Sequence, residues 1–120
     1  MISRCNREGF RLLLGLALVV ATWLALTPQP VPLPDAPLSD KWAHLLAYLV
    51  LAFLADASWP DRRFTAPKWS GLLLYGIAIE LLQTQIPNRV FSIGDIVANG
   101  AGIALYAFGG IYLLQRLGWR

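Results

Sequence analysis

Four long apolar segments alternate with short polar or proline-rich linkers along the chain. The segments cover residues 10–27, 41–59, 68–86 and 93–117, and no helical face within them is polar throughout. Because about 20 apolar residues in a helix cross roughly 30 Å of hydrocarbon, each segment is long enough to span a membrane. The pattern predicts an all-α, polytopic membrane protein, in which residues 1–120 form a single four-transmembrane-helix bundle.

The linkers separate these segments clearly. The first, "PQPVPLPDAPLSD" at 28–40, carries five prolines and cannot continue a helix. The second, "PDRRFTAPK" at 60–68, is short and basic, and the third, "PNRVFS" at 87–92, is shorter still. So short a final linker predicts that the third and fourth helices form a tight antiparallel pair.

The composition agrees with a membrane location. Hydrophobic residues make up 57% of the chain and charged residues 14%, against about 25% charged in a typical soluble domain. The net charge of +3 would also suit a nucleic-acid-binding protein. The basic residues lie beside apolar segments and form no basic face, however, so we expect membrane lipids and no nucleic acid as partners. The single cysteine, Cys5, excludes an internal disulfide and a cysteine metal cluster, and we expect no cofactor.

The positions of lysine and arginine orient the chain, because cytoplasmic loops are enriched in both. One side of the four-helix topology carries Arg4, Arg7, Arg11, Arg62, Arg63, Lys68, Arg116 and Arg120. The other side carries Lys41 and Arg89. We therefore expect both termini in the cytoplasm, with linkers 28–40 and 87–92 facing outward.

A cleaved signal peptide is the alternative interpretation of the first segment. Arg4, Arg7 and Arg11 form a basic region before an apolar run, as in a secretory signal. Against cleavage, no clear small-x-small site precedes Pro28. The topology of the other three segments is the same in either case.

Polar residues from three segments fall at the outer ends of the helices: Asp40, Lys41, His44, Glu80, Gln83, Arg89, Asp95 and Asn99. At 1.5 Å per residue, they lie about two turns or less below the outer edge. Lys41 and His44 share one face of the second helix, and Asp95 and Asn99 share one face of the fourth. We expect them to line a shallow polar pocket that opens outward.

A stripe of small residues runs beside the Asp95 and Asn99 face. Gly94, Ala98 and Gly102 repeat at four-residue spacing, which lets a neighbouring membrane helix approach closely. We expect this close packing to press Asp95 and Asn99 toward a partner helix.

The ionisable residues of this level have structural as well as functional interpretations. A charged Glu80 side chain within the lipid would cost free energy. It is either neutralised by Lys41 or Arg89, or it acts with His44 in proton transfer at a catalytic site. His44, the only histidine, either contacts a ligand or substrate or makes a structural hydrogen bond. Together with Glu80 and Asp95 it could form a metal set, but the usual ligand spacings are absent and we expect no metal.

Three further residues are predicted to have no role in a site. Asp56, Lys68 and Gln115 lie near the inner interface, and we expect them to be solvated at helix ends.

Arg89 is the residue best suited to bind a phosphate or carboxylate, and its structural alternative is an ion pair with Asp95 or Asp40.

Three ordered motifs resemble those of the VanZ-like family of small bacterial membrane proteins. They are "DKWAHLLAYLVLAFL", "IELLQ" and "NRVFSIGDIVANGAG", which contain D-K-x-x-H, E-x-x-Q and R-x-x-x-x-x-D-x-x-x-N-x-x-G. The resemblance covers residues 40–102, about half of the chain. It implies a multi-pass protein of the bacterial inner membrane with a role in the cell envelope, and it points to the same eight polar residues.

The predicted function is binding of a polar or anionic envelope molecule in the outward pocket, such as the head group of a lipid or cell-wall precursor. Because the family is named for a protein linked to teicoplanin resistance, a glycopeptide-related ligand is a further possibility that the resemblance implies. Lys41 and Arg89 would hold the anion, while Gln83 and Asn99 would orient it. The alternatives are a membrane-embedded hydrolase or transferase that uses His44 and Glu80, and a structural protein whose polar cluster only locks the helices.

Overall fold

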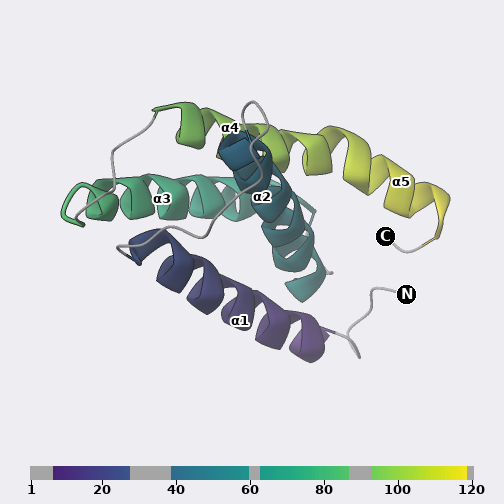
Figure 1. Ribbon diagram of the computed structural model, residues 1–120. Helices are drawn as coiled ribbons and strands as arrows, with labels where there is room; N and C mark the ends of the chain where they lie inside the picture. Colours follow the sequence, from purple (N-terminus) through teal and green to yellow (C-terminus); the bar gives the residue numbers. More distant parts are fainter. Residues whose placement is uncertain (1–6, 28–38, 60–62, 87–92, 119–120) are drawn as a thin grey trace.

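The computed structural model is all-helical over the residues that it describes, which are 7–27, 39–59, 63–86 and 93–118 (Figure 1). The first three helices are α1 (Arg7–Leu26), α2 (Ser39–Ser58) and α3 (Ala66–Gln83). A last continuous helix consists of α4 (Ile93–Leu105), a π-helical stretch η1 (Tyr106–Gly110) and α5 (Ile111–Arg116). The predicted α-class is confirmed for these residues, and four helices stand where four apolar segments were expected.

The helix ends differ from the sequence-based boundaries by a few residues. The third helix was predicted to start at residue 68, yet α3 begins two residues earlier, with Pro67 in its first turn. Proline is well tolerated there, because the first turn leaves its N–H groups unbonded in any case. The predicted end at residue 86 is also displaced, since residues 84–86 form a turn in which the Thr84 N–H donates to the Leu81 carbonyl at 3.3 Å.

The π-helical stretch was not anticipated. It begins at Tyr106, which is buried, and ends at Gly110, where an added Cβ would lie 2.8 Å from the Tyr106 ring. A glycine at this position therefore lets the ring lie against its own helix. The sequence signal was the pair Gly109 and Gly110 inside an apolar run, because such pairs relax helix geometry.

Polar contacts at one end of the molecule show how the helices are directed. The Lys41 side chain at the start of α2 contacts Asp95 at the start of α4. At the same end, the Gln83 amide at the end of α3 donates to the carbonyl of Ala25 at the end of α1, at 2.7 Å. This end, where α1 and α3 finish and α2 and α4 start, is called the Lys41 end below.

The opposite end shows the complementary contacts. Arg11 near the start of α1 donates from Nε to the Ser58 carbonyl at the end of α2, at 2.9 Å. Lys68 at the start of α3 reaches Asp56 near the end of α2, at 2.7 Å. Consecutive helices are therefore antiparallel, and this second end is called the Asp56 end.

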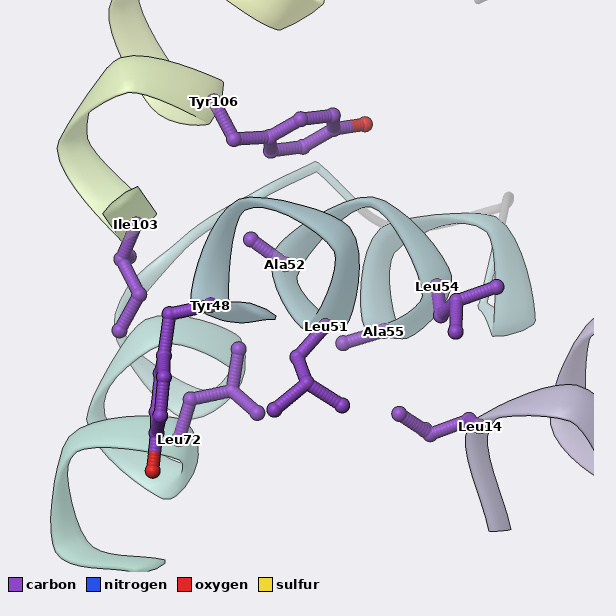
Figure 2. Packing of buried hydrophobic residues seen from close by; sticks show 9 residues of the cluster. All are labelled: Leu14, Tyr48, Leu51, Ala52, Leu54, Ala55, Leu72, Ile103 and Tyr106. Carbon is purple, nitrogen blue, oxygen red and sulfur yellow. The ribbon is translucent and has the colours of Figure 1, made fainter. Parts of the chain in front are cut away.

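An apolar core separates the two ends. In Figure 1, α2 crosses the other helices, and it packs mainly against α4 and α1. Figure 2 shows the buried side chains around α2, which are Leu14, Tyr48, Leu51, Ala52, Leu54, Ala55, Leu72, Ile103 and Tyr106. The ring of Tyr106 also meets Phe53 and Phe64 edge to face. Apolar packing thus lies between the two sets of polar contacts.

The helices α2 and α4 approach each other closely at Gly102 of α4. A Cβ atom there would lie 2.2 Å from the Leu45 carbonyl oxygen and 3.0 Å from the Leu49 amide nitrogen, both on α2. Ala98, one turn earlier, is buried, whereas Gly94 is exposed. The predicted role of the small-residue stripe is confirmed at its inner end, where it brings α2 and α4 into contact.

The outer surface of the bundle is strongly apolar. Exposed leucine, valine, isoleucine and aromatic side chains occur on every helix, and they include Leu16, Val19, Val50, Leu74, Val97 and Phe108. Two helices, α1 and the continuous helix Ile93–Arg116, are long and apolar enough to cross a membrane by length and composition. Little of either is buried inside the protein.

Candidate functional site

An ion pair between α2 and α4 forms the centre of the Lys41 end. The Lys41 Nζ lies 2.5 Å from Asp95 Oδ1, and the two side chains are 29% and 14% exposed. Asp95 stands in the first turn of α4, where the positive end of the helix dipole also favours a carboxylate. The pair therefore joins two helices whose contact residues are 54 positions apart in the sequence.

His44 contacts the same carboxylate of Asp95 and also Asn99, which lies one turn further along α4. Its Nδ1 is 3.1 Å from Asn99 Oδ1, and its Nε2 is 3.6 Å from Asp95 Oδ2. This geometry follows from the helical spacing, because Lys41 and His44 on one helix face Asp95 and Asn99 on the other. The sequence-based expectation that these two faces meet agrees with the observed contacts.

The polar network continues inward through Asn99 and Tyr48. A Cβ atom at Gly76 of α3 would lie 2.8 Å from both Asn99 Nδ2 and the Tyr48 hydroxyl, so these groups converge on that glycine. Glu80, one turn further along α3, is 1% exposed. Gly76 thus provides the space that brings side chains of α2, α3 and α4 together.

Gln83 and a pair of hydroxyl groups connect α3 with α1. Gln83 is buried and bonded to the Ala25 carbonyl, as described above. Deeper in the bundle, the Thr22 and Tyr75 hydroxyls are hydrogen-bonded to each other at 2.5 Å, and both lie within hydrogen-bonding distance of the Leu18 carbonyl oxygen. The helices α1, α2, α3 and α4 therefore all contribute to the polar contacts of this half of the molecule.

The structure brings some of the predicted site residues together and leaves others apart. Lys41, His44, Asp95 and Asn99 form one connected cluster. Glu80 is buried deeper in the bundle, beside Tyr48. Gln83 turns toward α1 instead of the cluster. Two further predicted residues are not described: the side chain of Asp40 and the whole of Arg89.

The charges of the connected cluster balance. Lys41 contributes one positive charge and Asp95 one negative charge, so the sum is zero with a neutral His44 and +1 with a protonated one. Both basic side chains contact Asp95 and remain partly exposed, with 32% exposure for His44 and 29% for Lys41. The cluster therefore presents basic groups at the surface, while its carboxylate is mostly buried.

We predict that Gly76→Ala disturbs this cluster without unfolding the protein. The atoms nearest to the new methyl group would be at the ends of the Tyr48 and Asn99 side chains, which can move. Displacement of Asn99 should break its hydrogen bond to His44, and NMR signals of the single imidazole should report it. Gly71→Ala is the matched control, because a Cβ there has nothing within 4 Å. Identical imidazole signals in the two variants would contradict the prediction.

A second polar cluster, at the Asp56 end, was interpreted wrongly from the sequence. Asp56 was expected to be solvated at a helix end, but it is fully buried. Its Oδ1 accepts from Lys68 Nζ at 2.7 Å and its Oδ2 from the Tyr106 hydroxyl at 2.5 Å. Lys68 is itself largely buried and also donates to the Trp59 carbonyl at 3.0 Å. The cluster lies inside the bundle because three helices close over it.

The sequence contained a signal for this second cluster. An antiparallel bundle brings the end of α2 level with the start of α3, just as it brings the start of α2 level with the start of α4. Asp56 and Lys68 therefore fall at one depth of such a bundle, just as the polar residues of the opposite end do. Tyr106 gave no comparable signal, because a tyrosine in an apolar run is usually a core residue.

Among the described residues, no group of three or more His, Cys, Asp and Glu side chains is arranged to hold a metal ion. Comparison with known proteins adds no relative: no family model, curated protein or solved structure matches the chain.

Proposed function

We propose that the chain is a multi-pass protein of the bacterial inner membrane that binds a polar or anionic head group at the Lys41 end. The head group would belong to a lipid or a cell-wall precursor. The observation that carries this proposal is that two partly exposed basic side chains, Lys41 and His44, lie side by side on a bundle whose surface is otherwise rich in exposed apolar side chains.

The membrane location rests on the distribution of side chains. Large apolar residues cover the outside, while Asp56, Glu80, Gln83 and Asn99 are buried inside. Soluble monomers rarely expose such continuous apolar surface, whereas polar residues in membrane bundles face the interior. In this proposal all four helices cross the bilayer, and the polar side chains of α2 and α3 are shielded by their neighbours.

The orientation and the family form part of the same proposal. The Asp56 end carries the basic residues Arg7, Arg11 and Arg63, as expected for a cytoplasmic side. The Lys41 end would then face outward, where head groups of the outer leaflet and envelope precursors lie. The motif resemblance to VanZ-like proteins supports an envelope role and names the same residues.

The geometry favours binding over the enzymatic alternative. An acid–base pair must reach one substrate together. His44 is partly exposed, but Glu80 is only 1% exposed. The purely structural alternative has more support, because the contacts of Lys41, His44 and Gln83 all join different helices. The experiment must therefore distinguish a site that binds a head group from polar contacts that only hold the helices together.

We predict that Lys41→Gln weakens binding of an anionic lipid about tenfold or more, the loss expected for one charge-assisted contact. The measurement is native mass spectrometry of the full chain in detergent, titrated with phosphatidylglycerol and, for comparison, phosphatidylcholine. Arg63→Gln is the matched control, because it removes one exposed positive charge from the opposite end. We expect it to leave the preference for phosphatidylglycerol unchanged.

A double variant separates the two interpretations. Lys41→Gln alone leaves Asp95 without one of its cationic partners, so it could act through lost folding. Lys41→Gln with Asp95→Asn removes both charges and keeps a hydrogen-bonding pair between α2 and α4. We expect the double variant to fold like the wild type and still to bind phosphatidylglycerol weakly. Wild-type lipid binding in the double variant would overturn the proposed function and leave the purely structural role of the cluster.

A further inference from the structure

We propose that the head group bound at Lys41 is an anionic phosphodiester and that its binding is coupled to the uptake of one proton by His44. This inference rests on the proposed function and concerns how the same cluster is regulated. Its basis is the shared carboxylate of Asp95, which Lys41 approaches at Oδ1 and His44 at Oδ2.

An incoming phosphodiester would compete with Asp95 for the ammonium group of Lys41, because lysine contacts phosphate as a point charge. It would also bring a second negative charge close to Asp95, which is only 14% exposed. Two negative charges close together at a poorly solvated position repel each other. Anion binding alone would therefore be opposed by the cluster unless a further positive charge forms beside Asp95.

His44 is already placed to replace Lys41. A protonated imidazole donates from both ring nitrogens. One N–H would then point to Asn99 Oδ1, at 3.1 Å, and the other to Asp95 Oδ2, at 3.6 Å. Asn99 anchors the ring, so only a small movement is needed to close the second contact. Histidine is also the side chain that ordinarily changes its charge between about pH 5 and pH 8.

The other charged and titratable groups at this level favour the exchange. From α4, His44 faces Asp95; on its own helix, Lys41 lies one turn away and Tyr48 one turn deeper. Behind Tyr48, α3 contributes the buried carboxylate of Glu80, and its Tyr75 phenol is bonded to α1. A bound monoanion would change the charge of the connected cluster from zero to −1. One proton on His44 restores it to zero.

The only covalent change in the exchange is the transfer of one proton. The proton passes from solvent to the imidazole of His44, where one N–H bond forms, and Lys41 stays protonated throughout. Because coupling between two ligands is reciprocal, acid should strengthen anion binding by the same factor by which the anion promotes protonation of His44. For one linked proton, this factor cannot exceed about tenfold per pH unit.

The test uses the full chain in phosphatidylcholine nanodiscs. Phosphatidylglycerol is the probe, because its phosphodiester keeps its charge between about pH 5.5 and about pH 8. We expect the affinity for phosphatidylglycerol to rise about tenfold as the pH falls from about 8 to about 5.5. The soluble diester glycerophosphoglycerol forms a second arm. Coupled binding of the lipid alone assigns the site to a membrane head group, and coupled binding of both probes extends it to soluble phosphodiesters.

Two variants test the coupling itself. His44→Gln should bind phosphatidylglycerol with the weaker affinity that the wild type has at high pH, and with no pH dependence. Asp95→Asn should also lose the pH dependence although it retains His44, because the neutral amide no longer requires a second cation. NMR of the single histidine should show more imidazolium when phosphatidylglycerol is present at constant pH.

The possible failures are distinguishable. If neither probe binds better than phosphatidylcholine at any pH, the proposed function fails and the coupling fails with it. If Lys41-dependent binding is found but is independent of pH, the proposed function stands and the coupling is overturned. The same conclusion follows if His44→Gln keeps the pH dependence of the wild type.

Discussion

Replacing Gly102 with alanine should destabilise the bundle more than any other single methyl group added to the described glycines. The new Cβ would lie 2.2 Å from the Leu45 carbonyl oxygen and 3.1 Å from the carbonyl carbon. These are backbone atoms of α2, so relief requires the two helices to move apart. Overpacking typically costs about 1–3 kcal/mol. We expect a loss at the upper end of this range, measured by denaturant unfolding of the detergent-solubilised protein followed by circular dichroism.

The same substitution at an open position gives the control. Gly71→Ala and Gly109→Ala add a methyl group with nothing within 4 Å. Alanine is the better helix former by about 1 kcal/mol, so these variants should be as stable as the wild type or slightly more so. If Gly102→Ala unfolds at the same denaturant concentration as they do, the close contact between α2 and α4 is not an important source of stability.

The consequences of Gly102→Ala should extend to the Lys41 end. Separation of α2 and α4 would lengthen both the Lys41–Asp95 and the His44–Asn99 contacts, which join the same two helices. The site is therefore built on close helix packing, and the small residue acts by permitting it. This relation explains why chemistry-bearing residues and a small-residue stripe occupy neighbouring faces of α4.

The helices and their antiparallel order could be predicted from the sequence, because they depend on local properties. Apolar length, proline-rich linkers and the short linker 87–92 all act within one segment or between neighbours. Helix ends were less accurate, since Pro67 fits inside the first turn of α3 instead of preceding it. The π-helical stretch at Tyr106 depends on how that ring lies against its own helix, which apolar periodicity does not reveal.

The pairing of site residues was partly predictable. The spacing of Lys41 with His44, and of Asp95 with Asn99, identified two faces that the structure brings together. The rotation of α3 about its axis was not predictable from its nearly uniform apolar sequence. That rotation decides that Glu80 is buried beside Tyr48 and that Gln83 reaches α1.

The interpretation of Asp56 failed for a different reason. A charged residue near a helix end can reach water, so solvation was the simpler expectation. In the structure, Phe64 and Tyr106 meet edge to face, Phe53 meets Tyr106 likewise, and Asp56 is enclosed. Long-range closure of this kind involves α2, the start of α3 and the last helix together, and no local pattern encodes it.

The bundle thus has one polar cluster at each end and apolar packing between them. The two clusters differ in exposure, which indicates different roles. At the Lys41 end, the basic groups remain partly accessible and can exchange partners. At the Asp56 end, the carboxylate and the ammonium group are enclosed, and the Tyr106 hydroxyl occupies the second carboxylate oxygen. The second cluster is therefore suited to holding helices in place and poorly suited to binding a ligand.

Removal of the Asp56 carboxylate should accordingly be among the most destabilising changes in the protein. Asp56→Ala would leave the ammonium group of Lys68 buried with main-chain carbonyls in place of its carboxylate. Breaking a buried ion pair by removing one partner costs about 3–5 kcal/mol. We expect a loss of that size in the free energy of unfolding. Glu8→Ala is the control, because Glu8 is an exposed ion-pair partner and should matter by less than about 1 kcal/mol.

A double-variant cycle identifies the source of this loss. Asp56→Leu with Lys68→Met replaces the pair by apolar side chains, which is often neutral or stabilising for buried ion pairs. We expect the double variant to recover most of the stability that Asp56→Leu alone loses. Tyr106→Phe should have a smaller effect, because it removes one hydrogen bond and keeps the ring packed against Phe53 and Phe64. If the single and double variants are equally unstable, the loss comes from packing around Asp56, and the ion pair does not hold the helices together.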